Sequence, residues 1–193
     1  MRSIRGLVAA VIVLLTVPVA IGVALATGGG AEPIIHFGIG AGMLLLAVAA
    51  FDFGLPRWIA WYGAATAGAF GGIFVLQGIA DAIGEPNLWH FAFSVLGQQP
   101  ERLLPELIVG WCIALLVLGS QGRTRIFGTI VLGTLIAAEV ITIGGPVFGV
   151  DVADIKLRWL LPFVWLLFES AKSAAPTRTI GRMQAPSVAE GVA

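Results

Sequence analysis

Apolar residues run in long blocks along the chain, separated by short polar gaps, from about residue 7 to residue 171. The blocks show no alternation of period two, and several reach the ~20 residues that a helix needs to cross a bilayer. Backbone polar groups in a bilayer must be paired within the segment, which a helix achieves. The pattern therefore predicts six membrane-spanning helices, at about residues 7–27, 34–51, 58–80, 103–119, 126–143 and 157–171.

Composition supports this class. Of the 193 residues, 58% are hydrophobic and only 11% are charged, whereas a soluble domain carries about 25% charged residues. We therefore expect an all-α integral membrane protein, a compact bundle of six transmembrane helices forming one domain over residues 1–172. Residues 173–193 are rich in Ala, Pro, Ser and Thr, a composition that predicts a disordered tail.

One long gap, residues 81–102, separates the third and fourth predicted spans. It contains an apolar stretch at about 87–97, flanked by charged and amide side chains, that is too short to cross a bilayer. This stretch predicts a short interfacial or re-entrant segment at one membrane face.

The basic residues indicate the orientation of the spans. Short cytoplasmic loops carry an excess of Lys and Arg. With the N-terminus inside, eight of the 11 basic residues lie on the cytoplasmic side, namely Arg2, Arg5, Arg57, Arg123, Arg125, Lys172, Arg178 and Arg182. We therefore expect a cytoplasmic-type cell membrane with both termini cytoplasmic. The first span also resembles a signal peptide with an Ala24-Leu25-Ala26 cleavage site, so its removal stays an alternative.

Ionisable residues at membrane depth are costly unless they are paired or hydrated, so they mark candidate sites. Glu139 lies about five residues, or roughly 7–8 Å, inside the outer end of the fifth span, with Thr142 on the same face. Gln77 and Asp81 share a face of the third span, and Glu106 enters the fourth span. All five fall in the outer half of the bundle. The alternative is that these residues meet only water, lipid headgroups or another helix.

The two histidines, His36 and His90, fall on the same outer side. Imidazole is the commonest ligand for zinc, copper and iron, and two histidines can also hold a haem axially. The residues are far apart in sequence and lack a His-x-x-x-His spacing. A haem or transition-metal site is therefore an alternative to the carboxylate site, and each histidine could instead be hydrated.

Three functions are compatible with these residues. The first is a small-solute, ion or proton permease or binding protein with its polar site in the outer half. The second is a haem- or metal-binding membrane protein. The third is a non-catalytic subunit or assembly factor, associating with a partner subunit or a second copy through Gly38/Gly42 or Gly68/Gly72. The same glycines could equally pack within one chain.

Other functions receive no support from the sequence. The single cysteine, Cys112, cannot form an intramolecular disulfide or a Cys-x-x-Cys motif. His90 and Ser94 are one helical turn apart, but no base-orienting group or oxyanion donors accompany them. No phosphate-binding loop and no basic, aromatic-interleaved patch is present, which argues against nucleotide and nucleic-acid binding. We therefore expect the bilayer to be the main partner and the role to be non-enzymatic.

Overall fold

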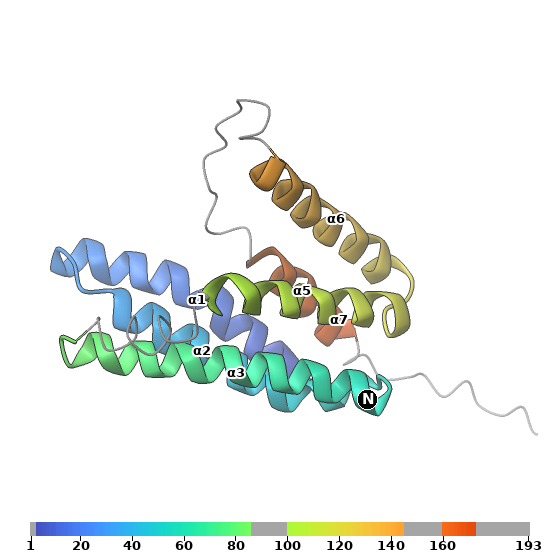
Figure 1. Cartoon of the computed structure of the whole chain (residues 1–193), viewed down its shortest axis with the longest axis horizontal. Helices are drawn as coiled ribbons and strands as arrows, with labels where there is room; N and C mark the ends of the chain where they lie inside the picture. Colours follow the sequence, from blue (N-terminus) through green and yellow to red (C-terminus); the bar gives the residue numbers. More distant parts are fainter. Residues whose placement is uncertain (1–2, 86–99, 145–159, 173–193) are drawn as a thin grey trace, which may run out of the picture.

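The computed structural model describes residues 3–85, 100–144 and 160–172. Over these residues it contains six α-helices and no strand, which confirms the predicted all-helical class, and one helix falls in each predicted span. The predicted segment at 87–97 and the tail at 173–193 lie outside the described residues. The helices are α1 (Ile4–Thr27), α2 (Glu32–Ala49) with a 3₁₀ turn η1 (Ala50–Phe53), α3 (Arg57–Ala82), α5 (Pro100–Leu118), α6 (Arg123–Gly144) and α7 (Leu161–Lys172) (Figure 1).

Three helices of the described chain are long and apolar enough to cross a membrane: Ile4–Thr27, Glu32–Phe53 and Arg57–Ala82. With 24, 22 and 26 residues, they are about 33–39 Å long at 1.5 Å per residue, against a hydrocarbon core of ~30 Å. In the apolar 18-residue stretch that qualifies each helix as a candidate span, only 28–39% is buried inside the protein. Most of their apolar surface therefore faces outward, which fits a membrane location.

Local sequence signals set the ends of these helices. The Ser3 hydroxyl accepts a hydrogen bond from the Gly6 amide at 2.9 Å and caps the N-terminus of α1. Gly28 ends the same helix in a left-handed conformation, with φ of 78°, that glycine adopts without strain. Pro33 lies in the first turn of α2, where its missing N–H costs nothing.

Glycines allow α2 to approach both of its neighbours closely. A Cβ on Gly38 would lie 2.2 Å from Thr16 Oγ1, so this face of α2 is filled by α1. On the other face, a Cβ on Gly71 of α3 would lie 2.9 Å from the Gly40 carbonyl oxygen. Backbone-to-backbone contact of this kind requires the absence of a side chain. The Gly38 face is thus used within the chain, whereas Gly72 has open space beside it.

The helices α1, α2 and α3 run antiparallel to their neighbours, and α5 and α7 lie against this group (Figure 1). The Tyr62 hydroxyl donates to the Leu107 carbonyl at 2.8 Å and joins α3 to α5. The first half of α6 packs on α7, where Gly128 leaves room for Trp165. Between the helices lies a core of large apolar side chains, including Trp111, Trp165, Phe163, Met43, Leu46 and Leu115.

The connections gather at two opposite ends of the bundle. The α1–α2 turn and the C-terminal end of α3 lie at one end, called here the outer end. The N-terminal end of α1, the η1 turn and the α5–α6 turn lie at the other, called the inner end (Figure 1). These names follow the predicted orientation.

Candidate functional site

Two ionisable side chains from different helices meet near the outer end. His36 lies in the second turn of α2, and Asp81 lies in the last turn of α3. Because the two helices are antiparallel and in close contact, these positions fall side by side, and the His36 Nδ1 atom contacts the Asp81 carboxylate Oδ2 atom. The side chains are 17% and 13% exposed. The contact is thus largely shielded yet still reachable from the surface.

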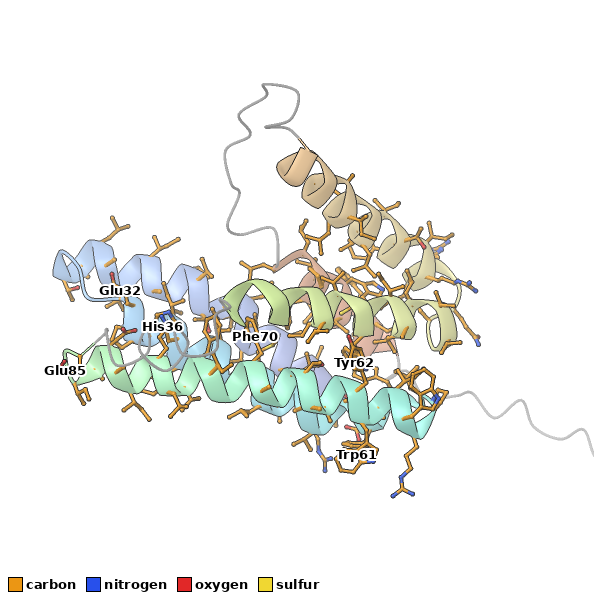
Figure 2. The ribbon with its side chains drawn as sticks, in the orientation of Figure 1. Glu32, His36, Trp61, Tyr62, Phe70 and Glu85 are labelled. Atoms are coloured by element: carbon orange, nitrogen blue, oxygen red, sulfur yellow. The ribbon has the colours of Figure 1, made fainter. Side chains whose placement is uncertain are left out.

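Aromatic side chains of α3 pack beside this pair. The Phe74 ring lies edge-on to the His36 imidazole, with centroids 5.5 Å apart and planes at 65°. Phe70 stacks on Phe74 at 4.6 Å, one turn further toward the inner end (Figure 2). The pair therefore has an apolar neighbour on its inner side. A low-polarity surrounding strengthens the attraction between imidazolium and carboxylate.

Exposed carboxylates surround the pair at the outer end. Glu32 lies one turn before His36 on α2, and Glu85 follows the end of α3 (Figure 2). Both carboxylates are exposed. The resulting field attracts protons and other cations toward the pair and disfavours anions.

The polar face predicted for α3, formed by Gln77 and Asp81, does not extend along the helix. Gln77 is half-buried, one turn from Asp81. Thr66 is 7% exposed, but its hydroxyl donates to the Tyr62 carbonyl at 2.8 Å within its own helix. Because Phe70 and Phe74 lie between Thr66 and Asp81 in the chain, the structure provides no continuous polar stripe along α3.

The remaining predicted site residues stay predictions. Glu139 and Thr142 belong to the C-terminal part of α6, and that end of α6 lies apart from α2 and α3 in Figure 1. Glu106 belongs to α5. The described side chains do not include those of these three residues, and His90 lies outside the described residues altogether. Within the described part, no group of three His, Cys, Asp or Glu side chains could hold a metal ion.

A second polar region lies at the inner end, and none of its residues is among the predicted site residues. Glu169 of α7 is 8% exposed, and its Oε2 atom accepts a hydrogen bond from the Ser120 hydroxyl at 2.7 Å. The Trp165 indole donates to the Thr124 carbonyl at 3.0 Å beside it. One sequence signal could have revealed Glu169, since it is a carboxylate within the last predicted span.

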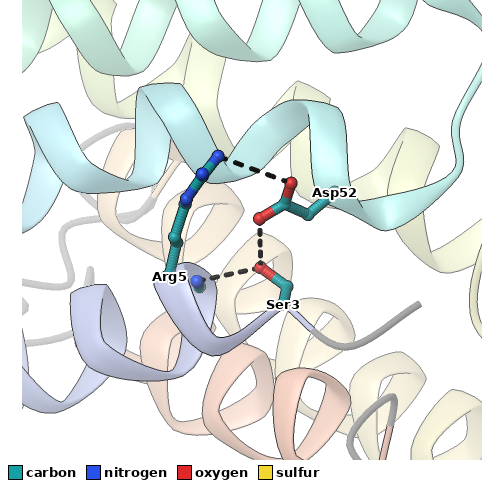
Figure 3. A network of polar contacts seen from close by, with 4 residues as sticks. Ser3, Arg5 and Asp52 are labelled. Atoms are coloured by element: carbon teal, nitrogen blue, oxygen red, sulfur yellow. Dashed lines mark hydrogen bonds and ion pairs between the residues drawn. The ribbon is translucent and has the colours of Figure 1, made fainter.

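The same end contains a network around Asp52 (Figure 3). The Ser3 hydroxyl lies 3.4 Å from Asp52 Oδ2, and the Arg5 guanidinium lies 3.8 Å from Oδ1. The network joins the start of α1 to the η1 turn. Its partners on α1 are a cation and a hydroxyl, so the network links the two elements through polar contacts.

No protein-family model matches the chain, and neither a curated protein nor a solved structure does.

Proposed function

We propose that this chain is a multi-pass membrane protein whose outer half takes up and releases a proton or small cation at the His36–Asp81 pair. In this proposal the chain crosses the membrane six times, with both termini in the cytoplasm. The single observation that carries the proposal is the contact between an imidazole and a carboxylate from two helices, near the exposed carboxylates of Glu32 and Glu85.

The chemistry of the pair suits proton exchange. Imidazole is the side chain that most readily changes charge near neutral pH, and its Nδ1 atom contacts the Asp81 carboxylate. Partial exposure lets water deliver the proton to the pair. The stacked Phe70 and Phe74 rings lie on the inner side of the His36–Asp81 pair. A proton or cation can therefore move further inward only if these rings move. They are the gate in this proposal.

The test is proton flux in vesicles that contain the purified protein and an entrapped pH-sensitive dye. After a pH jump, we expect His36→Gln and Asp81→Asn each to reduce protein-dependent flux at least tenfold. The matched control is Asp52→Asn, which removes a half-buried carboxylate at the opposite end and should leave flux within twofold. Wild-type vesicles no leakier than empty ones, or full flux in Asp81→Asn, would contradict the proposal.

A second candidate function, metal or haem binding, gains support from the same contact. Histidines that bind metals through one ring nitrogen usually hold a carboxylate with the other, and Nδ1 of His36 faces Asp81. Nε2 would then be the ligand atom, with His90 as the second ligand in this hypothesis. Elemental analysis and an absorption spectrum test it. Stoichiometric metal that is lost in His36→Ala and in His90→Ala would favour this function over proton transfer.

A further inference from the structure

A small groove lies at the inner end between the start of α6 and the end of α7. Its volume is about 240 Å³, and it is lined by Arg123, Thr124, Phe127 and Phe168. The two phenylalanine rings meet edge-to-face, with centroids 5.3 Å apart, and form an apolar wall. The groove is too small for a drug-sized ligand, whose pockets measure about 300–1,000 Å³, but it can accept a segment of an acyl chain.

The positively charged Arg123 side chain lines one edge of this apolar groove. Arg123 is exposed at the first position of α6, and the described residues provide no carboxylate within ion-pair distance of it. On a helix, Arg123 and Phe127 are four residues apart and share one face. The guanidinium and the apolar wall thus form one continuous surface.

An apolar groove with a guanidinium at its edge is complementary to one class of ligand. We propose that the groove binds an anionic phospholipid of the inner leaflet, with an acyl chain against Phe127 and Phe168 and the phosphate on Arg123. A guanidinium can hold two phosphate oxygens at once. The cytoplasmic leaflet supplies anionic lipid, and the exposed Arg5 and Arg57 at the same end suit that leaflet. The inference rests on the proposed membrane orientation and not on proton transfer.

The chain offers a closely matched control. Arg125 has the same charge and exposure and lies in the same helical turn. It is two residues from Arg123 and therefore points about 200° around the helix, away from the groove. Arg123→Gln and Arg125→Gln change the net charge equally, but only the first changes the proposed site.

The test is native mass spectrometry of the detergent-solubilised protein titrated with dipalmitoyl phosphatidylglycerol or dipalmitoyl phosphatidylcholine. We expect one phosphatidylglycerol to bind more tightly than phosphatidylcholine. Arg123→Gln should weaken its binding about fivefold, the typical contribution of one basic residue at an anionic membrane surface, while Arg125→Gln should change it less than twofold. Equal weakening by both variants would mean diffuse surface attraction and would overturn the site.

A second titration tests the acyl chain. Dihexanoyl phosphatidylglycerol has the same headgroup but chains too short to reach far into the groove, so we expect clearly weaker binding. Equal binding of the two chain lengths, or of inorganic phosphate, would show a headgroup site without a chain groove and would contradict the proposal. Phe168→Ala supports it if only the long-chain lipid loses affinity. Because proton flux is not measured, failure here leaves the His36–Asp81 proposal unaffected.

Discussion

The two ends of the bundle both hold carboxylates against polar partners, but they use them differently. At the outer end, Asp81 meets an ionisable imidazole, and both residues are half-buried. At the inner end, Glu169 accepts a hydrogen bond from the neutral Ser120 hydroxyl, and it is 8% exposed. A neutral partner and deep burial favour a permanent link between helices. A titratable partner and water access favour reversible chemistry.

The exposed charged side chains also differ between the two ends. The outer end displays Glu32 and Glu85, whereas the inner end displays Arg57, Arg123 and Arg125. This asymmetry attracts cations to the outer pair and anionic headgroups to the inner end. Two carboxylates near helix ends therefore need not share a role, because the partner atom, the exposure and the surrounding charges decide it.

The largest expected effect is at the inner end. Ser120→Ala removes the hydroxyl that donates to Glu169 and leaves a buried carboxylate poorly satisfied. We expect a loss of about 2 kcal/mol in the free energy of unfolding, measured by equilibrium unfolding in mixed micelles. The control is Thr129→Ala on α6, whose hydroxyl is exposed and bonds only to its own helix, with an expected change below about 0.5 kcal/mol. Equal losses would mean that the Glu169 contact is not a structural link.

A smaller effect is expected at the outer pair. A double-mutant cycle of His36→Gln and Asp81→Asn should give a coupling energy of about 1 kcal/mol, since interhelical polar contacts in membranes contribute roughly 0.6–1.7 kcal/mol. The measurement is the same unfolding experiment. A coupling larger than the Ser120→Ala loss would make this pair the main structural link and would reverse the comparison between the two ends.

The smallest effect is expected for the ion pair between Arg5 and Asp52. Its atoms are 3.8 Å apart, and the Arg5 side chain is 58% exposed, so water and salt screen the attraction. The corresponding cycle of Arg5→Gln and Asp52→Asn should give a coupling of about 0.3 kcal/mol, decreasing further in high salt. A salt-independent coupling near 1 kcal/mol would show that the network in Figure 3 contributes as much as the outer pair.

Much of the helical layout was predictable because it follows from local patterns. Apolar blocks and the Gly28-Gly29-Gly30 gap indicate where α1 ends and α2 begins, and the structure agrees within a few residues. Extensions were missed where charged residues begin a helix, as at Arg57 and Arg123, because such residues dilute the apolar signal. Glu32 at the start of α2 also suits the positive end of the helix dipole.

The site was less predictable, because it depends on contacts between distant residues. His36 and Asp81 were each selected from the sequence, but for different sites; their contact spans 45 residues and requires the antiparallel α2–α3 packing. Glu169 and Ser120 are separated by 49 residues, and Ser120 lies in a gap between predicted spans. Hydropathy reports the depth of one residue and contains no information on its partner in another helix.

The first and last described helices are neighbours, and this constrains how the protein is made. Gly6 of α1 lies against Ser170 of α7, where a Cβ on Gly6 would be 2.8 Å from the serine hydroxyl. The contacts between α1 and α2 can form early in synthesis, but the contact between α1 and α7 must wait until α7 itself has left the ribosome. Until then, the α7-facing side of α1 is without this partner, although α1 is the first of the described helices to be synthesised.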